Sequence, residues 1–183
     1  SLPASVTEID DYAFSDCSAL VEVSIPSSVD EIGSCAFNYC TALSSIVIPD
    51  SVTEIEEGAF AECRALTTVV LPNSLAEISD YLFSDCTSLS NILIPASVTE
   101  IETGAFQRCT SLLSIIIPDS VTEIEDIAFS QCSALRSVLL PASVTEIGVG
   151  AFDKCPNLTL TVFRNSYAER YAQRNHIPYT YAD

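Results

Sequence analysis

Cysteine and glutamate, two residue types that bind metals, each recur at one fixed spacing in this 183-residue chain. The spacing is 23 residues for both series. The cysteine series is Cys17, Cys40, Cys63, Cys86, Cys109, Cys132 and Cys155. The glutamate series is Glu8, Glu31, Glu54, Glu77, Glu100, Glu123 and Glu146. Because both series repeat in step, the chemistry of each must be weighed against a role in a repeated structure.

The cysteine series predicts buried thiols. Zinc needs four converging ligands, usually from C-x-x-C pairs, and the sequence contains no such pair. Cysteines of neighbouring copies would lie within reach of a disulfide, but their side chains would run parallel, which suits bridging poorly. A free buried cysteine packs as a small hydrophobic residue. Cys35 lies outside the series, and we expect it to be more accessible.

The glutamate series leaves two interpretations open. Stacked carboxylates repel each other, and Ca²⁺ could bridge them. The alternative is a solvated row with slightly raised pKa values, and we favour it because no D-x-D-x-D-G calcium loop is present. The residues that would bind calcium are Glu31, Glu54, Glu77, Glu100 and Glu123. A further acidic edge, interpreted as wetted surface, comprises Asp10, Asp11, Glu56, Glu57, Asp80, Glu102, Glu125 and Asp126.

No catalytic set is visible in the sequence. The single histidine, His176, lies beyond the repeats, and no nucleophile and base can be paired around it. The five glycines never form a G-x-G-x-x-G loop for phosphate. We therefore predict a protein without catalytic activity and without a cofactor.

The elements that must position these residues are seven copies of one unit. The second copy, Pro26 to Ile48, reads P-S-S-V-D-E-I-G-S-C-A-F-N-Y-C-T-A-L-S-S-I-V-I. Proline, phenylalanine and cysteine recur in all seven copies, without insertion or deletion. A fixed period of this length predicts a solenoid, in which each coil contacts only its neighbours.

Each copy contains three predicted segments. A stretch rich in β-branched residues, such as Leu43–Ile48, predicts a short strand that ends before proline and stacks in a parallel ladder. The P-x-S-V-T-E-I segment predicts a bend and a second short strand, with an invariant serine whose hydroxyl satisfies backbone groups. The A-F-x-x-C-x-x-L segment predicts one helical turn with an inward apolar face.

Two rows of side chains are predicted to point outward from the main strands. The apolar row is Val47, Val70, Leu93, Ile116 and Leu139. The polar row is Ser45, Thr68, Asn91, Ser114 and Ser137. A contiguous apolar stripe, on the order of a few hundred Å², is typical of an interaction site, although strand propensity alone also favours such residues. We predict a protein partner, or self-association, through this face.

The charge of the chain excludes several partners. The net charge is -18, which repels nucleic acid and anionic membrane surfaces. No apolar run is long enough for membrane insertion. The first copy shows no polar cap, so we expect a mature chain or a piece of a longer protein that lacks its N-terminal part.

The repeat resembles the BspA-like leucine-rich-repeat family. Leu43-Ser-Ser-Ile46-Val-Ile48 fits the L-x-x-L-x-L strand pattern, and the resemblance extends over residues 3–163. It implies an α/β-type leucine-rich-repeat rod, in a family whose members are typically secreted or attached to the cell surface. The family is associated with adhesion and protein binding, and the resemblance carries over no catalytic residues. It implies an extracellular or cell-surface location.

The chain is predicted to divide at residue 163. Residues 1–163 form the seven repeats, and residues 164–183 resemble the family's C-terminal cap, expected to close the open edge of the last coil. Ser166 and Glu169 form a capping box, which predicts a helix over about 167–175, followed by a strand over about 177–181. Two functions remain open: a recognition module, or a structural subunit whose apolar row is buried against a permanent partner.

Overall fold

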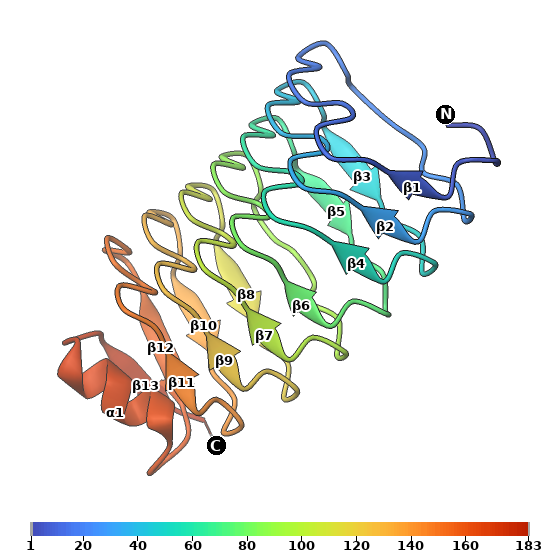
Figure 1. The fold of residues 1–183 in the computed structure, drawn as a ribbon. Helices are drawn as coiled ribbons and strands as arrows, with labels where there is room; N and C mark the ends of the chain where they lie inside the picture. The colour runs from blue at the N-terminus through green and yellow to red at the C-terminus, as the bar shows by residue number, and fades with distance from the viewer. Residues whose placement is uncertain (1, 183) are drawn as a thin grey trace.

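The computed structural model describes residues 2–182, which form a solenoid of seven stacked coils, one for each repeat (Figure 1). We number the coils 1 to 7 from Pro3 to Pro141. Each coil has three sides. In coil 2 these are the glutamate side at Glu31–Ile32, the turn side over residues 33–43, and the strand side over residues 44–48. The expectation of a stacked solenoid is confirmed.

The glutamate side carries a two-residue strand in every coil. Equivalent glutamates and isoleucines pair in parallel, as Glu31 does with Glu54, so the predicted second strand is confirmed. The strands form two sheets, β1-β2-β4 and β6-β7-β9-β11. Their bounds are β1 (Glu8–Ile9), β2 (Glu31–Ile32), β4 (Glu54–Ile55), β6 (Glu77–Ile78), β7 (Glu100–Ile101), β9 (Glu123–Ile124) and β11 (Glu146–Ile147).

The strand side carries the predicted main strands in five coils. The ladder is parallel and again split, into β3-β5 and β8-β10-β12-β13. In coil 1 only a bridge from Glu22 to Ser45 forms, and in coil 4 residues 91–93 form no strand, so the prediction of one strand in every copy is wrong there. The bounds are β3 (Ser45–Val47), β5 (Thr68–Val70), β8 (Ser114–Ile116), β10 (Ser137–Leu139), β12 (Thr159–Val162) and β13 (Tyr179–Tyr181).

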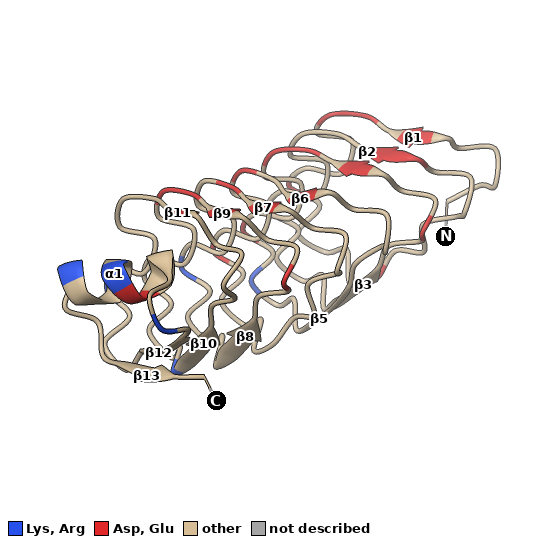
Figure 2. Ribbon diagram, turned by 90° about the horizontal axis from the view of Figure 1, so that it is seen from below, with Lys and Arg blue, Asp and Glu red and all other residues tan. Residues whose placement is uncertain are grey.

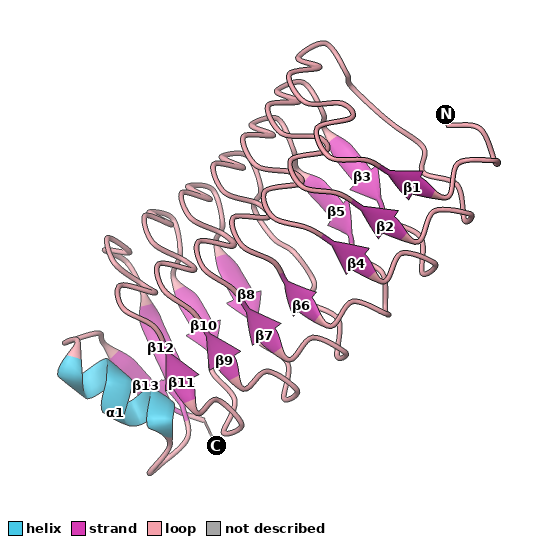
Figure 3. Cartoon of the chain, viewed as in Figure 1, coloured by secondary structure: helices cyan, strands magenta, loops and turns pink. Residues whose placement is uncertain are grey.

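The turn side is a chain of tight turns instead of the predicted helical turn (Figure 3). Its hydrogen bonds span three residues, as in Cys40 N–H to the Phe37 carbonyl at 3.1 Å. Two residues in each coil have left-handed backbone conformations, with φ between 51° and 67°. Such residues interrupt a right-handed helix. In coil 2 they are Cys35 and Tyr39, and in coils 3, 5 and 7 the first of the pair is glycine.

The core is built around a stack of the repeat phenylalanines. Phe14 through Phe152 form a continuous series of near-parallel rings with centroids 5.1 to 5.9 Å apart. The five rings from Phe37 to Phe129 are completely buried. No single coil could bury such a ring, so the core exists only through stacking.

The invariant cysteines have a hydrogen-bonding role that the sequence does not reveal. Each thiol from Cys40 to Cys155 donates to the carbonyl of the phenylalanine of the preceding coil, at 3.1 to 3.2 Å. The thiols from Cys40 to Cys132 are fully buried, as predicted. The prediction is wrong for Cys17, which is exposed, and Cys155 is only partly buried, because each lies in an end coil of the stack. Burial raises the pKa of Cys63 to about 12 and that of Cys40 to about 11. A raised pKa lowers the thiolate fraction and hence reactivity.

We expect a thiol reagent at neutral pH to modify the exposed Cys17 rapidly and the buried Cys86 and Cys109 only after unfolding. The reason is that burial holds the pKa of both buried thiols well above the ordinary value. Peptide mass spectrometry after timed alkylation measures each site separately. Fast modification of Cys86 in the folded chain would contradict the prediction, and the denatured chain provides the control.

The invariant serines also link neighbouring coils. The hydroxyl of Ser51 donates to the Val29 carbonyl at 2.6 Å, and the same bond forms in four other copies. The predicted hydroxyl ladder is therefore confirmed in these copies. Among coils 2 to 7, Ser120 is the exception, because its buried hydroxyl oxygen has no hydrogen-bond partner within residues 2–182.

The C-terminal residues form helix α1 (Tyr167–Arg174) and strand β13. The Glu169 amide donates to the Ser166 hydroxyl at 3.1 Å, and the Glu169 carboxylate accepts from the Asn165 amide at 2.6 Å. Tyr171 packs edge-on against Phe152 with centroids 6.2 Å apart, which ends the ring stack. Within the described chain, no helix has the length and apolar character needed to cross a membrane.

Candidate functional site

The strand face exposes the apolar row. The exposed fractions are 61% for Val47, 48% for Val70, 80% for Leu93, 67% for Ile116 and 37% for Leu139. The alternate residues, such as Ile46 and Ile115, are buried in the core, because side chains alternate along a strand. The neighbouring polar row, Ser45, Thr68, Asn91, Ser114 and Ser137, is exposed as well. We call these two rows together the strand face.

The strand face is uncharged although the molecule is strongly acidic. Its ten residues include no ionisable side chain, whereas the whole chain carries a net charge of -18. Figure 2 shows the acidic residues gathered along the side that carries β1, β2, β6, β7, β9 and β11, while β8 and β10 on the other side are free of acidic colour. A partner that covers the strand face therefore avoids desolvating the carboxylates, which would be costly.

An open hollow of about 470 Å³ lies at the N-terminal end of the strand face. Glu22, Ser24 and Ile25 of coil 1 line it together with Ser45 and Val47 of β3. Coil 1 contributes only the Glu22–Ser45 bridge to this ladder, so the hollow marks where the regular sheet ends. Glu22 gives this end an acidic group.

The glutamate side gathers three carboxylates into a cluster. One oxygen from each of Glu77, Glu100 and Glu102 lies within 4.8 Å of the other two. Glu77 and Glu100 are neighbours in the predicted glutamate series, and the structure adds Glu102 from the acidic edge. Glu31, Glu54 and Glu123 are not part of this cluster. The sequence did not indicate the grouping, because it depends on how coils 4 and 5 pack.

Some residues of the acidic edge link neighbouring coils and do not serve only as solvent-exposed surface. The Glu102 carboxylate accepts a hydrogen bond from the Asp80 amide at 3.0 Å. Glu56 and Glu125 accept equivalent bonds from Ser34 and Thr103 of the preceding coils, at 2.6 and 2.7 Å from the hydroxyl oxygens. Three members of the edge therefore fasten one coil to the next.

Burial raises the pKa of Glu102 to about 7, with further contributions from the charges of Glu77 and Asp80. Burial also raises the pKa of Glu77, helped by the charge of Glu100. The folded chain therefore binds protons at these glutamates in a pH range where the unfolded chain, with an ordinary glutamate pKa of about 4.3, has released them.

We expect the thermal unfolding midpoint to fall as the pH rises from about 5 to about 8, because a raised carboxyl pKa stabilises the fold below it and loses that effect above it. The Glu102→Gln variant should be the more stable protein at the upper end of this range and should show a shallower pH dependence. Glu146→Gln, at an exposed position of the glutamate series on the same side of the solenoid, is the control. Equal slopes for wild type and Glu102→Gln would contradict the assignment.

The calcium hypothesis for the glutamate series stays a prediction. The cluster offers three carboxylate oxygens, whereas calcium takes about six to eight oxygen ligands, so water would have to supply the remainder. Unfolding curves with Ca²⁺ and with a chelator test it directly. An unchanged midpoint would remove the hypothesis.

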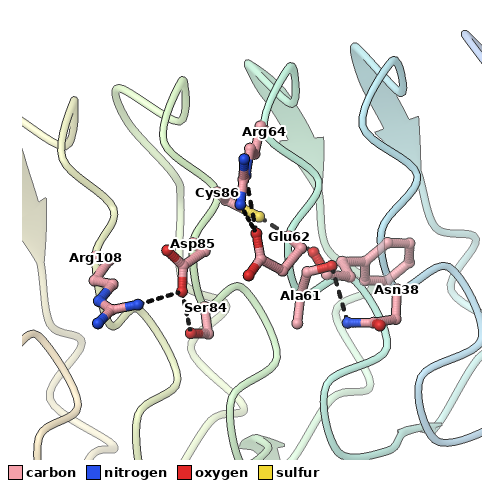
Figure 4. Close-up of polar contacts among 9 residues, drawn as sticks. Asn38, Ala61, Glu62, Arg64, Ser84, Asp85, Cys86 and Arg108 are labelled. Atoms are coloured by element: carbon pink, nitrogen blue, oxygen red, sulfur yellow. Dashed lines mark hydrogen bonds and ion pairs between the residues drawn. The ribbon is translucent and has the colours of Figure 1, made fainter. Parts of the chain in front are cut away.

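The turn side carries most of the basic residues of the repeats, and two of them lie beside an acid (Figure 4). Arg64 pairs with Glu62 at 2.7 Å, and Arg108 lies 3.6 Å from Asp85. Both arginine side chains are half exposed or more, so each pair contributes little to stability. This side varies from copy to copy, but its charges are already paired in these two places.

Parallel strands stacked at a 23-residue period, with one apolar face inward and one outward, define a leucine-rich-repeat solenoid. A family model for the BspA type leucine rich repeat region matches the chain in 6 copies, over residues 1–112 and 53–173. The chain belongs to this family of BspA-type leucine-rich-repeat proteins, as the resemblance of its repeats predicted.

Solved structures of bacterial proteins agree with this assignment. A leucine-rich repeat protein from Bacteroides ovatus has a TM-score of 0.85 at 30% identity, over 99% of this chain and 44% of its own. A T. pallidum leucine rich repeat protein gives 0.84 at 36% identity, over 98% and 83%. A leucine rich cell surface protein from Faecalibacterium prausnitzii gives 0.60 at 33% identity, over 87% and 59%.

The chain thus spans less than half of the B. ovatus protein. A search of curated proteins found no match.

Proposed function

We propose that this chain is a non-catalytic module of a secreted or cell-surface protein, which binds a protein partner through the strand face in an adhesion-type role. The observation that carries the proposal is the exposed apolar row from Val47 to Leu139, on an uncharged side of a strongly acidic molecule. Exposed apolar stripes of this kind are typical of interaction sites. The surface location is supported by the similarity to the cell surface protein of F. prausnitzii.

Leu93 and Ile116 are the proposed centre of the interface. They are the two most exposed members of the row and belong to adjacent coils. Residues near the centre of an interface tend to dominate its energy, because the surrounding contacts exclude water from them. The polar row of Ser, Thr and Asn beside them can supply hydrogen bonds at the rim.

The double variant Leu93→Asp/Ile116→Asp tests the proposal. Two charges in the centre should weaken binding of a specific partner by about a hundredfold or more, because each truncated hot spot costs about 2 kcal/mol. Val149→Asp is the matched control, since Val149 is 81% exposed but lies outside the strand face. The chain and both variants serve as bait for extracellular and surface proteins, and bound proteins are quantified by mass spectrometry.

Retention by the wild type and by Val149→Asp, with loss by the double variant, supports the proposal. Equal retention by all three removes the strand face from the interaction. The alternative function is a structural subunit, which predicts that the wild type is recovered only as an oligomer or filament. Light scattering of the purified chain distinguishes a monomer with a free strand face from such self-association.

A further inference from the structure

The junction between coils 3 and 4 lacks backbone hydrogen bonds that other junctions have. On the strand side, the Thr67 amide donates to the Ser44 carbonyl at 3.0 Å, and the Leu113 amide donates to Ser90 at 3.1 Å. Within residues 2–182, the equivalent amide of Ser90 makes no such bond to coil 3. Residues 91–93 pair neither with β5 nor with β8, so the strand ladder is interrupted on both sides of coil 4. The bond from Leu113 to Ser90 still joins coil 5 to coil 4, whereas among the residues described the strand side has no equivalent bond between coils 3 and 4.

The glutamate side is open at the same junction. The Thr53 amide donates to the Asp30 carbonyl at 2.9 Å, and the Thr99 amide donates to Ala76 at 2.8 Å. Ala76, the equivalent residue of coil 4, makes no such bond in the described part of the chain. Strands β4 and β6 do not pair. Two of the three sides of the solenoid therefore lose their regular ladders together.

Only the turn side keeps its regular backbone hydrogen bonds across this junction. The Gly58 amide donates to the Asp80 carbonyl at 2.8 Å, and the Glu62 amide donates to Ser84 at 2.8 Å. On the glutamate side a side chain substitutes for the backbone, because the hydroxyl of Ser79, instead of its amide, donates to the Ile55 carbonyl. Coils 3 and 4 are thus joined by backbone hydrogen bonds along one side. Elsewhere side chains link them: the hydroxyls of Ser74 and Ser79, and the Asp50 carboxylate, which accepts from the Asn73 amide at 2.8 Å.

The opening coincides with two enlarged core residues. Leu75 replaces the valine, and Leu82 the alanine, that the other six copies have at these positions. Both leucines are buried, at 1% and 0% exposure. A close-packed core cannot absorb additional carbon atoms without moving its neighbours.

The phenylalanine stack is less regular at coil 4 than elsewhere. Phe83 lies 5.9 Å from Phe60 and 5.6 Å from Phe106, with interplanar angles of 12° and 18°. The other ring pairs of the repeats are 5.1 to 5.3 Å apart, with angles of 3° to 8°. The widest and most tilted contacts of the stack therefore coincide with the two enlarged residues.

We propose that the junction between coils 3 and 4 is a hinge, which opens on the strand and glutamate sides about the turn side. The rod then consists of two blocks, coils 1 to 3 and coils 4 to 7 with the C-terminal residues. Opening changes the separation of Val70 and Leu93, and so the curvature of the strand face. The hinge follows from core packing and does not depend on the proposed binding function.

Single cysteines placed at inward positions of the strand side report the opening. Ile92 of coil 4 and Ile115 of coil 5 are both buried, at 8% and 3% exposure. We expect Ile92→Cys to be alkylated about tenfold faster than Ile115→Cys in the folded chain, because local opening exposes it. Peptide mass spectrometry separates these sites from the native thiols. Equal rates at the two sites would overturn the hinge.

Two packing variants test whether the enlarged residues Leu75 and Leu82 cause the opening. Leu75→Val/Leu82→Ala restores the residues of the other copies and should slow alkylation of Ile92→Cys to the rate of Ile115→Cys. Val98→Leu/Ala105→Leu introduces the same enlargement into coil 5 and should accelerate Ile115→Cys about tenfold. An unchanged alkylation rate of the reporter cysteine in both packing variants would overturn the proposal. Circular dichroism checks that each variant folds. If Leu75→Val/Leu82→Ala does not fold, the alkylation rate in Val98→Leu/Ala105→Leu alone decides whether the proposal stands.

Discussion

Replacing Phe129 by alanine should lower the free energy of unfolding by about 3–5 kcal/mol, the range for removing a buried phenylalanine. Phe129 is completely buried and stacks on Phe106 and on Phe152, each at 5.3 Å. The cavity cannot close by collapse, because the backbone of coil 6 is hydrogen-bonded to the coils on both sides. Urea unfolding followed by circular dichroism measures the change.

Phe14→Ala is the matched control for this variant. Phe14 occupies the same position in coil 1, is only partly buried, and stacks on a single ring, Phe37. The same truncation should therefore cost less there, because less surface is buried and fewer ring contacts are lost. Equal costs for the two variants would contradict the view that stacking between coils stabilises each ring.

Gly148→Ala should destabilise the fold by about 1–3 kcal/mol through steric overpacking. A Cβ atom at this position would lie 2.5 Å from the Glu125 carbonyl carbon and would also meet the Asp126 amide nitrogen. Both atoms belong to the backbone of coil 6, so rotation of a side chain cannot relieve the clash. The coils approach closely here because Asp126 accepts a hydrogen bond from the Val149 amide at 2.6 Å.

Glu125→Ala, at the equivalent position of the preceding coil, provides the comparison. A side chain is already accommodated there, so the variant loses mainly the 2.7 Å hydrogen bond from Thr103, worth about 1 kcal/mol. Urea unfolding of both variants measures the two changes in the free energy of unfolding. A Gly148→Ala protein as stable as the wild type would show that coils 6 and 7 can separate without cost.

The two variants disturb the packing between coils in opposite ways. Phe129→Ala removes material from between coils, and Gly148→Ala adds it. Coil 4 carries a natural addition, Leu75 and Leu82, and responds with open ladders instead of a compressed core. The break in both ladders between coils 3 and 4 therefore coincides with the two enlarged inward residues.

The function must be sought in residues that stacking does not require. The inward positions are nearly identical in every copy, and their burial leaves them no contact with a partner. Leu93 and Ile116 point outward and are free of this constraint. They are therefore the first positions at which a partner should be tested, whereas the glutamate cluster is tested by pH and by calcium.

The sequence alone determined the solenoid, the strand of the glutamate side, most strands of the strand side, and the outward rows. This was possible because each repeated residue meets its own copy one coil away, so the period itself specifies the contacts between coils. The identity of buried residues such as Phe60 and Cys63 followed from the same period. The exposure of Val47 and Ile116 followed from the alternation of side chains along a strand.

Only the tertiary structure decided the features that depend on distances between coils. The left-handed residues of the turn side, the thiol bond to the preceding phenylalanine carbonyl, and the grouping of Glu102 with Glu77 are of this kind. The open junction before coil 4 is another. A change from alanine to leucine at residue 82 looks conservative in sequence, and its consequence appears only when neighbouring coils must accommodate the added volume.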